Sequence, residues 1–177
     1  MLFSLVYITT RTIAPEYDFV YATEQVDSDV EVVFDDMAVP HIYANSEPDA
    51  MYALGYVHAM ERLWQMDLLR RAGAGELSAL FGRDMIENDK YLRSLGMRET
   101  AIRTVETLES TASPQVLEAM KAYLEGINAF IETKELPFVY RLINAKPEPF
   151  KLRDVYCATG FMAYSFAIHL KTEPILD

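Results

Sequence analysis

The sequence predicts a mainly α-helical chain with a short β-hairpin near its N-terminus, and three observations support this fold class. Residues 30–34 and 39–44 are two short β-branched or aromatic runs, separated by a turn-like Asp-Asp-Met-Ala. Apolar residues recur at helical spacing from residue 49 to about residue 71. Residues 114–131 and 154–170 have the same helical character. With 177 residues, the chain is long enough for one domain with a real core.

The composition is that of a folded, acidic protein. Hydrophobic residues make up 51% of the chain and charged residues 24%, which excludes wholesale disorder. The net charge of −11 repels phosphate backbones and anionic lipids, so no nucleic-acid partner is expected. Cys157 is the sole cysteine and lies in an apolar stretch, which predicts a buried, inert thiol.

Residues 1–29 are predicted to be an N-terminal extended segment that precedes the folded part, residues 30–177. The first eight residues are apolar but too short to cross a bilayer, which needs about 20 residues. They are either the remnant of a signal peptide or membrane anchor, or a first strand. Any membrane contact is expected only at this N-terminus.

Local signals place the ends of the elements. Pro40 favours a strand start or an edge strand. Ser46 is the expected N-cap of the first long helix, with Asp49 at the capping-box position. Gly73 and Gly75 are expected to stop that helix.

The rest of the chain is also expected to be mainly helical. Short helical turns are expected at 76–81, a mixed stretch at 84–97 and a polar helix near 99–109. Ser113 and Pro114 begin the next helix, and loops surround a short aromatic run near Pro137.

Two of these helices lack the polar half that a surface helix normally has. In the first, a consistently polar arc holds only His58, Glu61, Arg62 and Gln65. In the last, no ionic side chain occurs between Asp154 and His169, so this helix is expected to be buried. One small chain would expose too much apolar surface if nothing else covered both helices. An obligate partner or a continuation of the chain is therefore predicted.

The chain contains no motif of a complete catalytic site. GxSxG, phosphate-binding loops, GxGxxG and CxxC are all absent from the sequence. His58 and Glu61 resemble the start of a zinc-binding HExxH helix, but Glu61 is misplaced and no second histidine follows at the required spacing. A satisfied polar contact is the predicted role of His58.

Several long motifs resemble, in order and spacing, the N-terminal α chain of the penicillin acylase family. They are residues 31–44, 53–59, 62–71 and 81–82, continued by 89–96, 126–131 and 146–150. The resemblance implies an N-terminal nucleophile hydrolase with an αββα layered fold, of which this chain is the α-chain part. It departs from the family at Ala38, Glu61 and Glu76, where Gly, Asp and Arg are usual. Ala38 matters if its turn requires a positive φ, which alanine resists.

The resemblance also implies an amidohydrolase made as a precursor that cleaves itself into two chains. The nucleophile is then the N-terminal Ser of a β chain, activated by its own α-amino group, so no catalytic residue is expected in this chain. A β chain is the expected partner, and a small N-acyl amide is the expected substrate. The expected location is the periplasm or another extracytoplasmic space. N-acyl-homoserine lactones, β-lactam antibiotics and acylated peptides are the candidate substrates.

By the same resemblance, residues 162–166 line the acyl pocket, with Met162, Tyr164, Ser165 and Phe166 as candidate substrate-binding residues. Ordinary core packing is the alternative role. Ser165 stands where some members carry a basic residue, which argues against a carboxylated substrate such as penicillin. No cofactor is expected for catalysis. Glu173 falls near the position of a family calcium ligand, so it is either part of a structural calcium site shared with the β chain or a solvated side chain.

Two other functions are compatible with the same sequence. A helical binding module would use the apolar helices to hold a protein or lipid partner without chemistry. A peripheral membrane protein would depend on residues 2–8 alone.

Overall fold

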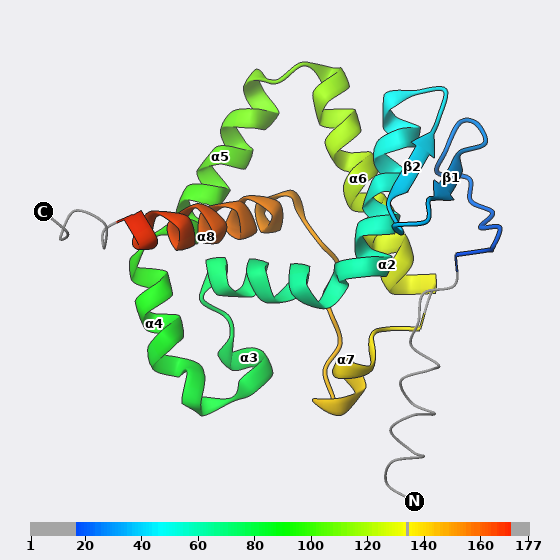
Figure 1. The fold of residues 1–177 in the computed structure, drawn as a ribbon. Helices are drawn as coiled ribbons and strands as arrows, with labels where there is room; N and C mark the ends of the chain where they lie inside the picture. Colours follow the sequence, from blue (N-terminus) through cyan, green and yellow to red (C-terminus); the bar gives the residue numbers. More distant parts are fainter. Residues whose placement is uncertain (1–16, 134, 171–177) are drawn as a thin grey trace, which may run out of the picture. The chain divides into compact units, whose positions relative to one another are not determined.

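The computed structural model describes residues 17–133 and 135–170 (Figure 1). It is mainly helical with one two-stranded antiparallel sheet, as predicted. The elements are β1 (Glu31–Phe34), β2 (Pro40–Tyr43), α2 (Glu47–Ala74), α3 (Ser78–Phe81), η1 (Arg83–Met85), α4 (Ile86–Ser94), α5 (Met97–Thr111), α6 (Pro114–Thr133), α7 (Phe138–Leu142) and α8 (Leu152–Leu170).

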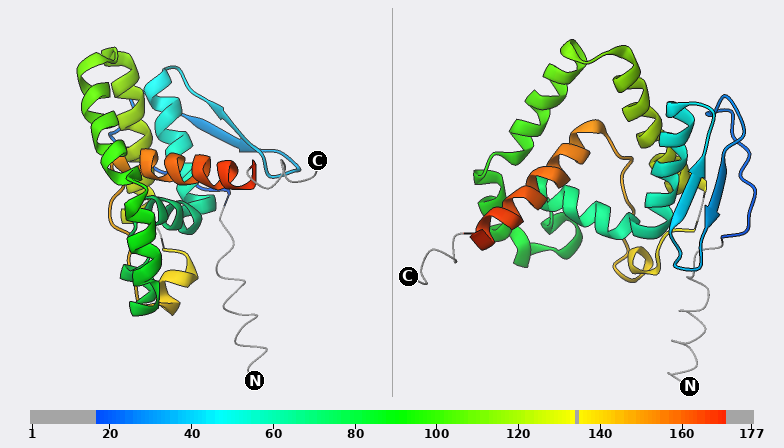
Figure 2. Two further views of the ribbon diagram at one scale, coloured as in Figure 1. Left: turned by 90° about the vertical axis from the view of Figure 1, so that its left-hand side faces the viewer. Right: turned by 45° about the horizontal axis from the view of Figure 1, so that its top comes forward.

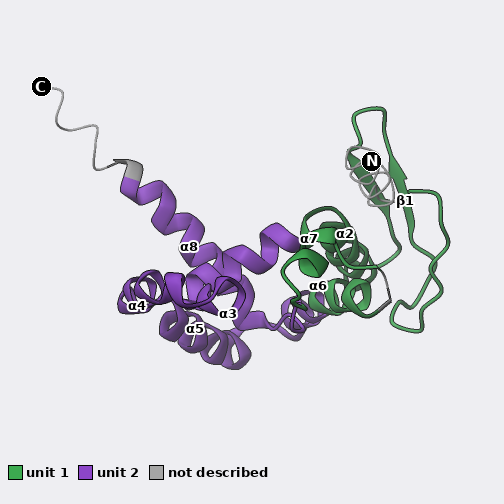
Figure 3. Cartoon of the chain, turned by 90° about the horizontal axis from the view of Figure 1, so that it is seen from below, with its two compact units in different colours: residues 1–63, 122–146 green, residues 64–121, 147–177 purple. Residues whose placement is uncertain are grey.

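The chain forms two compact units, coloured separately in Figure 3. Unit 1 contains the hairpin, the first part of α2, the second part of α6 and α7. Unit 2 contains the rest of α2, α3 to α5, the start of α6 and α8.

In unit 1, β1 and β2 pair with Glu31 opposite Tyr43 and Phe34 opposite Pro40. Pro40 starts β2, as predicted. The turn between the strands is held by the carboxylate of Asp35, whose Oδ1 accepts the N–H groups of Met37 and Val39, each at 2.9 Å. The tight turn places Ala38 at a φ of 57°. The turn therefore requires the left-handed conformation that glycine adopts readily.

Replacing Ala38 with glycine is expected to stabilise the protein by about 0.5–1 kcal/mol. An alanine Cβ in the left-handed region costs about 1–2 kcal/mol, part of which is offset by the greater entropy of glycine in the unfolded chain. Urea denaturation of the wild type and Ala38→Gly measures the difference. Met37 is the matched control because its φ is not positive. Met37→Gly should lower stability, and a loss of stability in Ala38→Gly would contradict this explanation of the turn.

The first turn of α2 confirms Ser46 as the N-cap, because its Oγ accepts the N–H of Asp49 at 3.2 Å. The reciprocal half of the predicted capping box is wrong. The carboxylate of Asp49 instead accepts the N–H of Asp27 at 2.9 Å and the hydroxyl of Ser28 at 3.0 Å. The pKa of Asp49 lies below its usual value, mainly because of the bond from Asp27. Asp49 thus joins the irregular segment before β1 to the helix.

The polar arc predicted on α2 is largely present. After the first turn of α2, the exposed side chains are those of His58, Arg62 and Gln65. Glu61 is half-buried and accepts the hydroxyl of Tyr17 at 2.8 Å. His58 Nδ1 lies 3.0 Å from the hydroxyl of Tyr123 on α6, which confirms the polar contact predicted for this histidine.

Within unit 1, the α2 and α6 backbones touch at two glycines. A Cβ added to Gly55 would lie 2.0 Å from the carbonyl oxygen of Tyr123. One added to Gly126 would lie 2.0 Å from the carbonyl oxygen of Tyr52. Ile127, with no exposed surface, lies in the same turn of α6. Both glycines are therefore required for the close approach of the two helices.

Unit 2 contains a similar approach, between α2 and α8. The predicted stop at Gly73 is wrong, because α2 continues to Ala74 and ends at Gly75, whose φ is +65°. A Cβ on Gly73 would lie 2.0 Å from the carbonyl oxygen of Cys157. The thiol of Cys157 is buried, and burial raises its pKa to about 11, which confirms the predicted inert thiol.

Helix α5 packs against α8 within unit 2, and the two helices cross at an angle in Figures 1 and 2. The mixed stretch expected at 84–97 is mostly helical, forming η1 and α4. Asp89 of α4 accepts the N–H groups of Leu77 and Ser78, each at 2.8 Å. Burial alone would raise the pKa of Asp89, but the bonds from Ser78 and Leu77 bring it below the usual value. An ionised Asp89 therefore fixes the start of α3 to α4.

The short aromatic run after Pro137, for which the sequence predicted no secondary structure, forms helix α7 in unit 1. Within residues 17–133 and 135–170, no helix is both long enough and apolar enough to span a membrane.

Candidate functional site

The candidate substrate-binding residues all lie on the second half of α8, but they do not share one side of it. At 3.6 residues per turn, Met162, Ser165 and Phe166 project from the same side, whereas Tyr164 projects from the opposite side. Met162 is 45% exposed and Phe166 is 72% exposed, whereas Tyr164 and Ser165 are half-buried. The structure therefore brings three of the predicted residues together and separates the fourth.

Met162 and Phe166 belong to an exposed strip that we call the α8 apolar face. It consists of Met162, Ala163, Phe166 and Ala167, all of which are exposed. In this chain alone, the second half of α8 therefore carries the exposed apolar surface that the sequence predicts a partner or a continuation of the chain to cover. Cys157 and Ala101 pack together in a small core on another side of α8, where α5 covers the helix. An apolar surface of this kind typically binds a ligand or another protein.

The polar groups next to this face are already engaged. The hydroxyl of Tyr164 hydrogen-bonds with the hydroxyl of Tyr91 on α4. This bond is the main reason that the pKa of Tyr164 lies above its usual value. Ser165 Oγ donates to the carbonyl oxygen of Phe161 at 2.8 Å, within the helix. Tyr91 was not anticipated from the sequence, because nothing local in α4 indicates a contact with α8.

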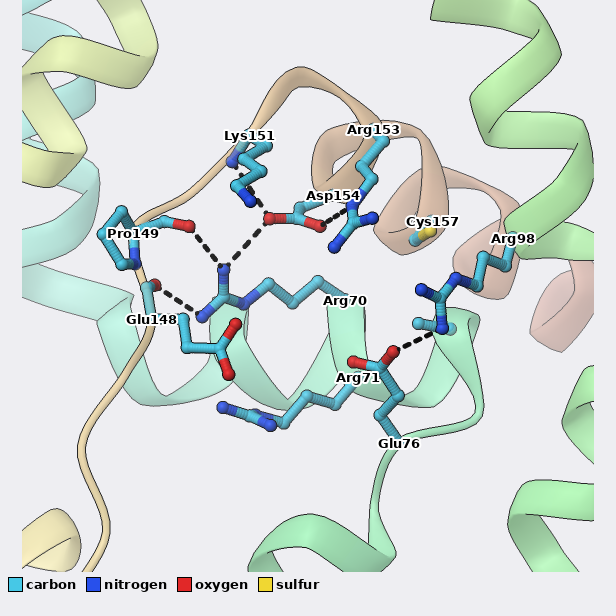
Figure 4. Close-up of a pocket in the computed structure, with 11 residues that line it drawn as sticks. Arg70, Arg71, Glu76, Arg98, Glu148, Pro149, Lys151, Arg153, Asp154 and Cys157 are labelled. Atoms are coloured by element: carbon cyan, nitrogen blue, oxygen red, sulfur yellow. Dashed lines mark hydrogen bonds and ion pairs between the residues drawn. The ribbon is translucent and has the colours of Figure 1, made fainter.

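A buried ionic cluster at the start of α8 is formed by Asp67, Arg70, Arg71 and Asp154. Figure 4 shows Arg70, Arg71 and Asp154 of this cluster. The Arg70 guanidinium lies 2.7 Å from Asp67 Oδ1 and 3.1 Å from Asp154 Oδ2. It also donates to the carbonyl oxygen of Glu148 at 2.8 Å and lies 3.8 Å from the centre of the Phe150 ring. With the carbonyl oxygen of Pro149 at 3.4 Å, Arg70 thus meets two carboxylates, two backbone carbonyls and an aromatic face, which suits a buried guanidinium.

The cluster orients the beginning of α8. Asp154 Oδ2 also accepts the N–H of Lys151, the residue before the helix, at 2.9 Å. A carboxylate in the first turn favours helix formation because it interacts with the unpaired N–H groups there. Arg70 therefore ties this first turn to α2. A sequence signal for the cluster exists, since ionic residues at 67, 70 and 71 interrupt an apolar run at i, i+3 and i+4 spacing.

The remaining site prediction concerns a metal. Glu173 lies outside the described residues. Among the residues that are described, no three His, Cys, Asp or Glu side chains are close enough together to hold a metal ion.

Comparisons with known proteins identify the relatives of this chain. A family model described as penicillin amidase matches residues 29–177. The chain is 40% identical over 123 residues to penicillin acylase 2 proenzyme of Pseudomonas sp. (strain SE83), covering 69% of this chain and 15% of that protein. It is 33% identical over 130 residues to acyl-homoserine lactone acylase QuiP of Pseudomonas fluorescens (strain Pf0-1), covering 71% of this chain and 15% of that protein.

A third relative and a solved structure agree with these. Penicillin G acylase of Escherichia coli is 30% identical over 153 residues, which cover 81% of this chain and 17% of that protein. The chain therefore spans less than a fifth of the length of these relatives.

A chain of the thermostable penicillin G acylase from Alcaligenes faecalis matches with a TM-score of 0.68 and 30% identity. The match covers 78% of this chain and 74% of that chain, so a solved relative contains a separate polypeptide of comparable size. The fold, the sequence relatives and the family model agree, and the chain belongs to the penicillin amidase family.

Proposed function

We propose that this chain is the α-chain segment of an amidohydrolase that hydrolyses the amide bond of N-acyl compounds. The observation that carries the proposal is the α8 apolar face, where Met162 and Phe166 project side by side and uncovered. In the proposed enzyme this face contacts the acyl group, and a second chain from the same precursor closes the pocket. The similarity covers this segment, and we propose the acylase activity for the whole protein of which it is part.

The chemistry of the face suits an acyl group. An acyl chain offers mostly CH₂ groups or an aromatic ring, and its burial against apolar side chains is favourable by about 25 cal/mol per Å². Methionine adapts its shape to different groups, whereas phenylalanine provides a rigid wall. The relatives reported above are acylases of penicillin and of acyl-homoserine lactones, so both classes are candidate substrates, together with acylated peptides.

The proposed reaction is divided between the two chains. The N-terminal Ser of the second chain attacks the amide carbonyl, the amine leaves, and water releases the acid from the acyl-enzyme. An oxyanion hole on the same chain stabilises the charge that develops. This chain binds and orients the acyl group. Its described residues contribute through the α8 apolar face and through the ionic cluster that fixes the first turn of α8.

Expression of the complete coding sequence tests the proposal. Native mass spectrometry should find this chain with a larger polypeptide whose N-terminal residue is Ser, and the pair should release acids from a panel of N-acyl amides. A stable 20.2 kDa protein without a second chain and without hydrolysis would contradict it and favour a non-catalytic helical binding module.

Replacing Phe166 with alanine should lower kcat/KM for long-chain or aromatic acyl substrates by about 10- to 100-fold. The reason is the lost burial of a large aromatic side chain against the acyl group, worth about 1.5–3 kcal/mol. Short acyl substrates should be affected much less. Phe138→Ala is the matched control because it removes another exposed phenylalanine, on α7. An equal loss for short and long acyl groups would contradict the assignment of Phe166.

We further propose that Glu173 contributes to a structural calcium site shared with the second chain, and that the enzyme acts in the periplasm or another extracytoplasmic space. Calcium needs six to eight oxygen ligands, so one Glu requires several others from the second chain. Calcium should raise the Tm of the assembled protein, and Glu173→Gln should abolish that rise. The same calcium-dependent rise in Glu173→Gln would contradict the assignment.

A further inference from the structure

We propose that Arg71 forms a binding site for a single carboxylate group, in a cavity of about 20 Å³ within unit 2. The cavity lies between the end of α2 and the start of α8 (Figure 4). Its lining includes Arg70, Arg71, Arg98, Lys151, Arg153 and Asp154. This site goes beyond the proposed hydrolysis and does not depend on the α8 apolar face.

The terminal nitrogens of the Arg71 guanidinium are available to a ligand. Its side chain is only 9% exposed, and its Nε lies 3.1 Å from Asp67 Oδ1. Arginine carries five N–H donors, so this bond leaves the four on the two Nη atoms. Neither Nη atom makes a hydrogen bond to any of the described residues. A buried charged group with so many unused donors favours an acceptor that enters the cavity.

The neighbouring groups point to an anion. Five cationic side chains and three carboxylates line the cavity, although the chain as a whole carries a net charge of −11. Arg70 is already committed to Asp67, Asp154 and two backbone carbonyls. Arg98 pairs with Glu76 at 2.6 Å, and Arg153 with Asp154 at 3.4 Å. The pair between Arg153 and Asp154 also uses only Nε, but the Arg153 side chain is 36% exposed, whereas that of Arg71 is 9% exposed. Arg71 is therefore the buried guanidinium in this cavity whose two terminal nitrogens remain for a ligand.

The size of the cavity selects a carboxylate. A volume of about 20 Å³ holds about one water molecule, so only a very small terminal group of a ligand can enter. Tetrahedral sulfate or phosphate exceeds this space, whereas the oxygens of a planar carboxylate fit the fork of the two Nη atoms. The carboxylate comes either from an acidic side chain of the second chain or from a free short-chain carboxylic acid.

The test uses the complete, assembled protein and measures its Tm against formate, with sulfate at matched ionic strength as the bulky comparison. Arg71→Lys keeps a positive charge beside Asp67 but loses the fork, and Arg71→Gln loses both. Arg153→Gln is the matched control because it removes another cation from the same cavity. Should Arg71→Gln fail to fold, Arg71→Lys still provides the comparison.

If the ligand is free, formate should raise the Tm of the wild type to a plateau, sulfate should not, and Arg71→Lys should weaken formate binding at least ~10-fold. If the ligand belongs to the second chain, formate should have no effect on the wild type. Acidic residues of that chain are then neutralised one at a time, alone and combined with Arg71→Lys. For one of them the Tm change of the double variant should differ from the sum of the two single changes, and it should equal that sum when Arg153→Gln replaces Arg71→Lys. No formate effect together with additivity at every acidic residue of that chain would overturn the proposal.

Discussion

Arg70→Ala is expected to lower the free energy of unfolding by about 3–5 kcal/mol, the usual cost of breaking a buried ion pair by removing one partner. The Arg70 side chain is 7% exposed, and its loss leaves the carbonyl oxygen of Glu148 without this donor and removes one of the cations paired with Asp154. Asp67 keeps Arg71 as a partner, so it contributes less to the loss of stability. Urea denaturation of the assembled protein measures the loss.

The control for this prediction is Arg62→Ala, which removes an exposed arginine from the same helix. Its effect should stay within about 0.5 kcal/mol, as for most surface substitutions. Enzyme activity is the second measurement, and it distinguishes a role of Arg70 in positioning α8 from a role in overall stability alone. Because the cluster fixes the first turn of α8, Arg70→Lys should reduce hydrolysis of N-acyl substrates even under conditions where the protein remains folded. A loss below about 1 kcal/mol in Arg70→Ala would contradict the stabilising role of the cluster.

Gly126→Ala should destabilise the protein by about 3 kcal/mol, at the upper end of the usual cost of overpacking. The added Cβ would lie 2.0 Å from the carbonyl oxygen of Tyr52, and a backbone atom cannot move aside as a flexible side chain can. The two helices would have to separate, which would disturb the buried packing of Tyr56 against Phe130. The higher helix propensity of alanine, about 1 kcal/mol, offsets only part of this cost.

The matched control is Gly160→Ala on α8. There the added Cβ would lie 3.6 Å from the side chain of Met97, an ordinary van der Waals distance. This substitution should leave stability unchanged or raise it by up to about 1 kcal/mol, because alanine favours the helix. Thermal unfolding of both variants measures the contrast. Equal effects of the two substitutions would contradict the close approach of α2 and α6.

The elements that the sequence predicts correctly are those set by local chemistry. Two β-branched runs around a turn predict the hairpin, and Ser46 predicts the start of α2. Pro114 likewise begins α6, where the N–H of Val116 donates to Ser113 Oγ at 3.4 Å. Each of these signals depends on neighbours within a few residues. The turn at Ala38 also belongs here, because its departure from the usual glycine indicates where a positive φ is required.

The features that the sequence does not predict depend on contacts between distant segments. The carboxylate of Asp49 accepts the N–H of Asp27 rather than that of Ser46, and Gly73 allows the close approach of α2 and α8 rather than ending α2. The bond between Tyr91 and Tyr164 joins helices that are far apart in the chain. The apolar character of α8 predicts that something covers it, but periodicity does not say which half lies against the same chain. Such contacts follow from tertiary packing, which local patterns do not encode.

The central claim is that the α8 apolar face contacts the acyl group, and photo-crosslinking tests it most directly. The probe is an N-acyl amide with a diazirine in its acyl chain, bound to the assembled protein and irradiated, after which labelled peptides are identified by mass spectrometry. The account predicts labelling at Met162 or Phe166 that excess unlabelled substrate prevents. Competable labelling confined to the second chain, with none on residues 159–168, would contradict it.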